Sequence, residues 1–175
     1  MILLTGGAGY IGSHAAIEFI KAGYSVVVLD NLSNSKLEAV KRTQTLAGVN
    51  FDFIKGDIRD RVLLDEVFAK YKIQSVVHFA GLKAVGESVQ QPLRYYDNNV
   101  NGSLVLFEAM TAANVNTIVF SSSATVYGDP HTVPIKEDFP LSTTNPYGAS
   151  KLMIENILRD VHVANPHWRI ALLRY

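Results

Sequence analysis

The sequence predicts a three-layer α/β/α domain built on a doubly wound parallel sheet with strand order 3-2-1-4-5-6. Three observations support this prediction. Short apolar runs alternate along the chain with segments that repeat apolar residues at helical spacing. The apolar runs are continuous, which is typical of parallel strands that helices cover on both faces. A glycine-rich turn separates the first run from the first helical segment, and right-handed crossovers then order the strands.

The first half of the chain contains four of the expected strands. The run Ile2 to Thr5 is short and apolar, and the glycine turn follows it at once. Apolar residues then recur at helical spacing over Ile11 to Lys21, and Gly23 ends that helix. The other elements of this half are strands at Ser25–Asp30, Phe51–Ile54 and Ser75–Ala80, a helix from about Leu37 to Ala47 that ends at Gly48, and a helix from the capping residue Asp60 to Tyr71.

The second half repeats the alternation and adds a long loop. The segment from Gly128 to Pro146 is rich in Pro, Thr and Asp, which indicates an irregular polar connection. The expected elements are a helix over roughly Leu93–Ala113, a strand at Thr117–Ser121, a helix over Tyr147–Val163 and a strand at Trp168–Leu173. Together they form one Rossmann-type domain that covers residues 1–175.

The composition excludes several classes of function. Lys plus Arg and Asp plus Glu number 16 each, so bulk charge gives no attraction to nucleic acid or to a membrane surface. The absence of cysteine excludes disulfides and thiolate chemistry, and it suits a cytoplasmic location without proving one. No apolar run approaches the roughly 20 residues of a membrane span. The histidines show no metal-ligand spacing, so no metal site is expected.

Gly6, Gly9 and Gly12 follow a strand and open a helix, which is the context that a dinucleotide-binding turn requires. Glycine lets backbone N–H groups approach a pyrophosphate, and the helix N-terminus adds roughly half a positive charge. The spacing G-x-x-G-x-x-G is not the commonest one, so the turn alone is equally compatible with a structural role. Asp30 ends the second strand, where a carboxylate can bind ribose hydroxyls and repel a 2′-phosphate. NAD is therefore favoured over NADP, unless Asp30 merely begins a turn.

Further candidates follow other strands. Asp57 and Ile58 come after the third strand, where they can pair with and pack on adenine, although Asp after Gly is common in ordinary turns. Lys83 stands beside a glycine on a strand-end loop and is a candidate contact for a phosphate or a substrate. Because the carboxyl ends of parallel strands meet at one edge of the sheet, these residues and Ser121 to Ser123 are expected to converge there.

Tyr147 and Lys151 stand at positions i and i+4 and therefore share one face of the expected helix. A free phenol has a pKa of about 10 and is a poor base at neutral pH. The neighbouring ammonium and a positive nicotinamide ring are expected to lower the pKa of Tyr147. Ser123 can orient the same hydroxyl of a sugar substrate. Such a pair is common on solvated helices, and it gains weight here from the serines and the glycine turn.

These motifs resemble a known family. The segments Thr5–His14, Ser121–Ser123 and Tyr147–Lys151 are similar to those of the extended short-chain dehydrogenase/reductase family. A closer resemblance, to the branch that epimerises UDP-sugars at C4, comes from His78–Ser88, Tyr95–Gly102 and Phe120–Asp129. The resemblance covers essentially the whole chain. It implies that NAD stays bound through turnover and that UDP-glucose and UDP-galactose interconvert by transient oxidation at C4.

The resemblance also implies roles for single residues. It places Tyr10, Ile11, Asn31, Asn34 and Ser35 near the pyrophosphate and the adenosine, Phe79, Ala80, Gly81, Lys83, Asn98 and Ser121 along the cofactor, and Tyr175 near the nicotinamide. Core packing is the alternative for Phe79 and Tyr175, and a solvated helix position is the alternative for Asn98. The candidate contacts with the UDP-sugar are Lys83, Ser123 and Tyr147, and the candidate catalytic residues are Tyr147, Lys151 and Ser123.

Ala124 and Thr125 discriminate within the family. Related nucleotide-sugar dehydratases place an Asp-Glu pair there to drive loss of water, which neither Ala nor Thr can do. Two alternatives stay open: another nucleotide-sugar enzyme of this fold, a dehydratase or a reductase, and a non-catalytic NAD-binding module. Family members continue with a smaller C-terminal part that grips the UDP-sugar, so these residues alone are expected to have weak activity or none. The resemblance further implies a homodimer formed by the helices expected at Leu93–Ala113 and Tyr147–Val163.

Overall fold

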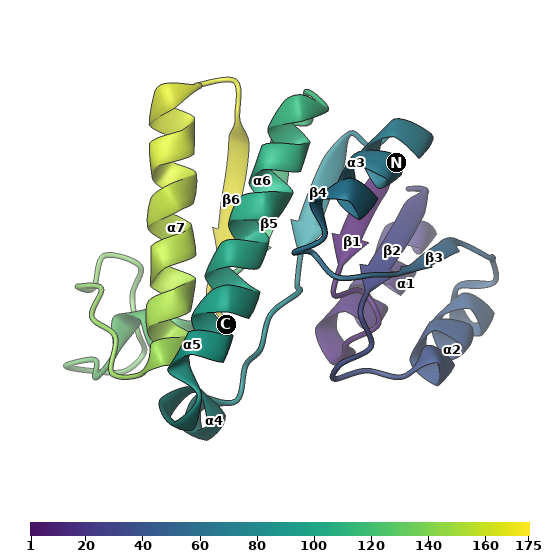
Figure 1. Ribbon diagram of the computed structural model, residues 1–175. Coiled ribbons are helices and arrows are strands. Elements are labelled where there is room, and N and C mark those ends of the chain that lie inside the picture. The colour runs from purple at the N-terminus through teal and green to yellow at the C-terminus, as the bar shows by residue number, and fades with distance from the viewer.

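The computed structural model describes residues 1–175. A parallel sheet lies between two layers of helices (Figure 1). Its strands are β1 Ile2–Thr5, β2 Val26–Asp30, β3 Asp52–Lys55, β4 Ser75–His78, β5 Thr117–Ser121 and β6 Arg169–Leu173. Its helices are α1 Tyr10–Lys21, α2 Leu37–Ala47, α3 Arg61–Lys70, α4 Val85–Gln90, α5 Pro92–Tyr95, α6 Gly102–Ala112 and α7 Pro146–Ala164. The sheet order β3-β2-β1-β4-β5-β6 confirms the predicted topology.

Successive side chains of the central strands enter two separate hydrophobic cores. Leu3 and Val27 pack with residues of α3, α6 and α7, whereas Leu4 and Val28 pack with residues of α1 and α2. All four side chains are at most 1% exposed. Burial on both faces explains why these strands appear in the sequence as unbroken apolar runs.

The region between β4 and β5 departs from the expected single helix over Leu93–Ala113. The short helix α4 comes first, and a π-helical turn over Tyr96–Asn101 separates α5 from α6. Within this turn the buried Asn99 amide hydrogen-bonds to the backbone N–H and carbonyl of Leu82 and to the Ser150 hydroxyl. The spacing of apolar residues in the sequence does not indicate such polar partners. A π-helical turn is typical of a functional region of a helix.

Two smaller differences from the expected elements lie at the carboxyl ends of β4 and β5. β4 ends at His78 rather than at Ala80, so Phe79 and Ala80 begin a loop. A 3₁₀ turn over Ala124–Tyr127, η2, follows β5 and is capped by the Ser123 side chain. The segment from Gly128 to Pro146 is irregular up to the start of α7, as the sequence predicts.

None of the helices combines the length and the apolar composition that crossing a lipid bilayer requires.

Candidate cofactor-binding and catalytic site

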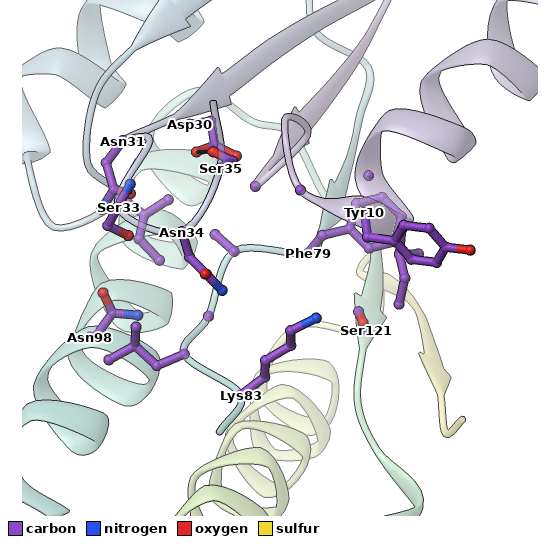
Figure 2. Close-up of a pocket in the computed structure, with 18 of the residues that line it drawn as sticks. Tyr10, Asp30, Asn31, Ser33, Asn34, Ser35, Phe79, Lys83, Asn98 and Ser121 are labelled. Carbon is purple, nitrogen blue, oxygen red and sulfur yellow. Dashed lines mark hydrogen bonds between the residues drawn. The ribbon is translucent and has the colours of Figure 1, made fainter. Parts of the chain in front are cut away.

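A cavity of about 430 Å³ lies beyond the carboxyl ends of β1, β2, β4 and β5 (Figure 2). Every predicted site residue except Asp57 lines it. The predicted residues that do so are Gly6, Gly9, Tyr10, Ile11, Gly12, Asp30, Asn31, Asn34, Ser35, Ile58, Phe79, Ala80, Gly81, Lys83, Asn98, Ser121, Ser123, Tyr147, Lys151 and Tyr175. Figure 2 shows Lys83 extending into this space from the loop after β4. The convergence at the strand ends is therefore observed, while the role of each residue stays a prediction.

The glycine turn between β1 and α1 has no room for a side chain at Gly6 or Gly12. Gly6 adopts a φ of +68°, and a Cβ on it would lie 2.5 Å from the backbone nitrogen of Ala80. A Cβ on Gly12 would lie 2.5 Å from the Gly6 carbonyl oxygen. The first turn of α1 has no acidic residue and no side-chain cap, so its N–H groups are left for another partner. This cradle fits a diphosphate, which needs close backbone N–H groups and a helix N-terminus.

Replacing Gly12 with Ala is expected to lower the free energy of unfolding by about 2 kcal/mol, because overpacking against fixed neighbours costs on that order. Besides the Gly6 oxygen, the new Cβ would approach the Gly7 Cα to 2.7 Å, and neither backbone atom can turn aside as a side chain can. Gly86→Ala in α4 is the matched control, since nothing lies within 4 Å of a Cβ there. Urea denaturation of both variants measures the difference. Equal midpoints would contradict the steric account.

Asp30 has the turn-forming role that the sequence left open, while its role in binding ribose stays a prediction. Its side chain is buried, and its Oδ2 accepts a hydrogen bond of 3.0 Å from the Ala8 N–H of the glycine turn. Its Oδ1 accepts from the Leu32 N–H and the Ser35 hydroxyl, both at 2.8 Å. A carboxylate offers about four acceptor sites, so room for roughly one ribose hydroxyl remains. Asp30 therefore ties the glycine turn to the loop after β2 and still faces the cavity.

Asp57 does not line the cavity, and its pairing with adenine stays a prediction. Its carboxylate accepts hydrogen bonds from Arg59 at 2.8 and 2.9 Å and from the Asn31 amide at 2.9 Å. These bonds, those of Arg59 above all, hold the pKa of Asp57 well below its usual range. Asp57 thus anchors Asn31, which does line the cavity. The arginine two positions later was the available signal for this pairing.

Lys151, itself one of the catalytic candidates, is a buried residue. Its exposed fraction is 4%, and its Nζ donates a 2.8 Å hydrogen bond to the Ser121 carbonyl. The same nitrogen lies 4.8 Å from the centroid of the Phe120 ring and 5.9 Å from that of Tyr147. Burial lowers the pKa of Lys151 to about 8. The amine can therefore exchange a proton near neutral pH, while the strand end holds it in place.

The predicted lowering of the Tyr147 pKa includes the charge of a bound nicotinamide ring and stays a prediction. Burial raises the pKa of Tyr147 above its ordinary value, and hydrogen bonding with the Ser123 side chain opposes that rise. The approach of Lys151 is to the ring at 5.9 Å, which is too weak to reverse the effect of burial. At the start of α7, the Asn145 side chain caps the helix by accepting from the Gly148 N–H at 2.8 Å. This cap fixes the direction from which Tyr147 enters the cavity.

Sequence reasoning missed some of the residues that line the cavity. Most of them are chain neighbours of assigned residues, so the signal was adjacency to a motif rather than a pattern of their own. The missed residues are Leu29, Ser33, Gly56, Leu82 and Ser122.

His78 has a structural role behind the cavity. Its Nδ1 is 2.6 Å from the Thr5 hydroxyl and its Nε2 is 2.9 Å from the Ser103 hydroxyl, which in turn donates to the Asn99 carbonyl. Because Ser103 donates its proton there, it accepts from the Nε2–H of a neutral imidazole. Burial and the charge of Lys151 lower the pKa of His78 to about 3. The chain of hydrogen bonds connects β1, β4 and the π-turn.

This buried imidazole predicts a loss of stability in acid. The pKa of His78 rises from about 3 in the folded chain to its ordinary 6.5 on unfolding, so between these values the unfolded chain binds more protons. The free energy of unfolding therefore falls as the pH drops from 6.5, by roughly 3 kcal/mol at pH 4 from this residue. His78→Gln is expected to be less stable at pH 7 but flatter in this range. Urea denaturation across pH tests this, and parallel curves for the two proteins would contradict it.

Comparisons with known proteins were made on sequence and on structure. A family model described as GDP-mannose 4,6 dehydratase matches residues 3–173. The UDP-glucose 4-epimerase of Bacillus subtilis (strain 168) is 59% identical over 174 residues, which are 99% of this chain and 51% of that protein. That of Dictyostelium discoideum is 58% identical over 174 residues, 99% of this chain and 51% of that protein.

A solved structure gives the same result. The crystal structure of the UDP-glucose 4-epimerase from Bifidobacterium longum in complex with NAD⁺ and UDP superimposes with a TM-score of 0.98 at 54% identity. The match covers 99% of this chain and 52% of that one. This chain spans about half the length of the curated relatives that it matches.

Proposed function

Because this chain belongs to the extended short-chain dehydrogenase/reductase family, within the group that the GDP-mannose 4,6 dehydratase model describes, we propose that it takes part in the NAD-dependent interconversion of UDP-glucose and UDP-galactose. The main support for the proposal is that Tyr147, Lys151 and Ser123 line the same cavity as the tightly packed glycine turn of Gly6, Gly9 and Gly12. Residues 1–175 would supply the cofactor-binding part of the site. The NAD and UDP bound to the Bifidobacterium longum enzyme support both ligands.

The cofactor would lie along the strand ends. The N–H groups at the start of α1 would bind its diphosphate, and Asp30 would bind an adenosine ribose hydroxyl. When bound, NAD would supply reversible oxidation at C4 of the sugar. Tyr147 would accept the proton of the C4 hydroxyl while Ser123 holds that hydroxyl, and Lys151 would stabilise the phenolate. After the 4-keto sugar turns over, return of the proton from Tyr147, together with the hydride that the reversible oxidation gives back, would give the epimer.

Dehydration is the main competing reaction, because the matching family model carries a dehydratase description. Loss of water needs an acid and a base beyond Tyr147. The positions directly after Ser123 hold Ala124 and Thr125, and neither side chain titrates in the working range. No group of three or more His, Cys, Asp or Glu side chains is placed to hold a metal ion as a substitute. Epimerisation without elimination is therefore the better-supported chemistry. A non-catalytic NAD-binding module is less well supported, since Tyr147 and Lys151 are both present.

We further propose that the protein works in the cytoplasm and that it forms a homodimer. The homodimer is supported by a shallow depression of about 580 Å³ between the π-turn, α5, α6 and α7, because mostly apolar side chains line it. Leu93 is 82% exposed there, and Leu104 and Met153 are 39% and 44% exposed. Packing this surface against its symmetry mate would cover all three.

The proposed function is tested on the purified protein. The nucleotide that co-purifies is released by denaturation and identified, and NAD is the expected result. UDP-galactose is then added, and the product is followed by proton NMR. UDP-glucose supports the proposal, whereas a 4-keto-6-deoxy sugar would indicate a dehydratase. Binding of NAD without any product would match the weak or absent activity expected of residues 1–175 as the cofactor-binding part.

A further inference from the structure

The loop after β4 runs from Phe79 to Ala84 and begins against the glycine turn. A Cβ on Gly6 would lie 2.5 Å from the Ala80 nitrogen and 2.8 Å from the Phe79 carbonyl carbon. Lys83 lies later in the same loop, and its side chain extends into the cavity (Figure 2). A dinucleotide held at the glycine turn would therefore bring its diphosphate close to this loop.

Lys83 is the charged side chain of the cavity that has no partner within the chain. Asp30 accepts hydrogen bonds from the glycine turn and from the loop after β2, and the Lys151 Nζ donates to the Ser121 carbonyl. No hydrogen bond or ion pair holds the Lys83 ammonium, and the residue is exposed. A lysine side chain is flexible and loses conformational freedom when it binds an anion. Its placement in the cavity therefore depends on how firmly its backbone is held.

Asn99 holds the residue before Lys83. Its Oδ1 accepts from the Leu82 N–H at 2.8 Å, and its Nδ2 donates to the Leu82 carbonyl at 3.0 Å. The Nδ2 also donates to the Ser150 hydroxyl at 3.0 Å, and Oδ1 accepts from the Asn98 amide at 2.9 Å. An amide side chain offers two donors and two lone pairs, so all of them are used. Asn99 is 1% exposed, and water therefore does not compete for these bonds.

Tyr95 holds the residue after Lys83. The Ala84 N–H donates to its phenol oxygen at 3.0 Å, and the phenol proton faces the Ala84 carbonyl at 2.9 Å and the Glu87 carboxylate at 2.8 Å. Tyr95 is 0% exposed, and burial raises the pKa of Tyr95 to about 12, so the phenol keeps its proton. Tyr95 ends α5, and Asn99 lies in the π-turn that follows. One helical segment therefore holds the chain on both sides of Lys83.

We propose that Tyr95 and Asn99 are positioning residues that hold Lys83 so that its ammonium meets the diphosphate of the bound dinucleotide. The proposal deepens the proposed function and rests on it for the identity of the ligand. The Leu82 carbonyl belongs to the peptide group before Lys83, and the Ala84 N–H belongs to the one after it. Because peptide groups are planar, holding both fixes the backbone angles of Lys83. The direction of its side chain is thus set before the ligand arrives, and less entropy is lost on binding.

Calorimetric titration with NAD, on purified protein stripped of bound nucleotide, measures the role of Tyr95. Tyr95→Phe removes the phenol oxygen but keeps the buried ring, so the variant is expected to fold. Its affinity for NAD is expected to fall about fivefold, because the loop must then be ordered on binding. Lys83→Ala is expected to lower the affinity about tenfold, since it removes a charge-assisted hydrogen bond to a phosphate.

Two comparisons separate positioning from packing. In the Lys83→Ala background, Tyr95→Phe is expected to leave the affinity for NAD unchanged within about twofold, because the hydroxyl acts through the ammonium. Tyr96→Phe removes a phenol oxygen from the same helical segment but outside the cavity, and no effect is expected. An equal fall in affinity with and without Lys83 would overturn the proposal. An unchanged affinity in Tyr95→Phe alone would overturn it as well.

A second measurement needs no ligand. NMR relaxation of the Lys83 backbone amide gives its order parameter, which is expected to be about 0.85 in the unsubstituted protein and below about 0.6 in Tyr95→Phe. A Lys83 amide that is flexible from the start, or that stays rigid without the Tyr95 hydroxyl, would contradict the proposal. If the unsubstituted protein binds no NAD, the proposed function fails together with the diphosphate as ligand. The relaxation measurement then still decides whether Tyr95 holds Lys83.

Discussion

Tyr147→Phe is expected to reduce turnover of UDP-galactose by about 10²–10⁴-fold, which is the usual contribution of a positioned acid–base group. The phenol oxygen is the group placed to take the proton, because Lys151 is buried against the Ser121 carbonyl and the Ser123 oxygen already accepts two hydrogen bonds from Thr125. Binding of NAD should be unchanged, since the glycine cradle and Asp30 do not depend on that oxygen. Steady-state kinetics and a calorimetric titration with NAD measure the two quantities separately.

The matched control for this variant is Tyr24→Phe, which removes a phenol oxygen from an exposed side chain outside the cavity. It should leave both turnover and NAD binding unaltered. If Tyr147→Phe weakened NAD binding as much as turnover, Tyr147 would be a structural residue. Retention of nearly full turnover would mean that another group accepts the proton.

Glu155→Leu is expected to lower the free energy of unfolding by about 3–5 kcal/mol, because it leaves a buried charge without its partner. The Glu155 side chain is 0% exposed and accepts two hydrogen bonds from Arg174, at 2.9 and 2.6 Å. It also accepts from the Ser122 hydroxyl at 2.6 Å. Burial by itself raises the pKa of Glu155, but its partners, first among them Arg174, outweigh that and hold it below the ordinary value.

A second variant separates the lost partner from the lost packing. Arg174 is 15% exposed and also donates to the Tyr127 hydroxyl at 2.6 Å. Replacing both residues, as Glu155→Leu with Arg174→Met, should cost less than Glu155→Leu alone, since no buried guanidinium is left unpaired. Arg159, which also pairs with Glu155 at 2.8 Å, is 43% exposed and remains hydrated. Urea denaturation of Glu155→Leu, of Arg174→Met alone and of the double variant gives the values needed for the cycle. Additive losses would show that the two residues do not interact in the folded state.

The features that local sequence determines were predictable. The glycine turn, Asp30 and the Tyr147–Lys151 spacing depend on residues close in sequence or on the edge where parallel strands end. Because that edge is a property of the topology, a correct strand order brings the candidates together. Their presence around one cavity follows from the sheet order.

The features that distant polar partners determine were not predictable. The π-turn depends on hydrogen bonds of Asn99 to Leu82 and Ser150, which lie 17 and 51 positions away. The hydrogen bonds of the Asp57 carboxylate with Arg59 and Asn31 were likewise not foreseen. Burial, which the sequence does not report, raises the pKa of Tyr147 in the chain without a bound nicotinamide. Each of these features depends on a tertiary contact or on the burial of a side chain.

The pairing of β6 with β5 determines when the cavity can form during synthesis. The backbone N–H of Ser122 donates to the Leu173 carbonyl at 2.7 Å, and that of Ala124 donates to the Tyr175 carbonyl at 2.7 Å. A nascent chain must therefore have emerged from the ribosome as far as Tyr175 before the serine segment gains these partners. Contacts of such long sequence separation form late in folding. Capture of a nucleotide is consequently expected to be among the last events in the maturation of these 175 residues.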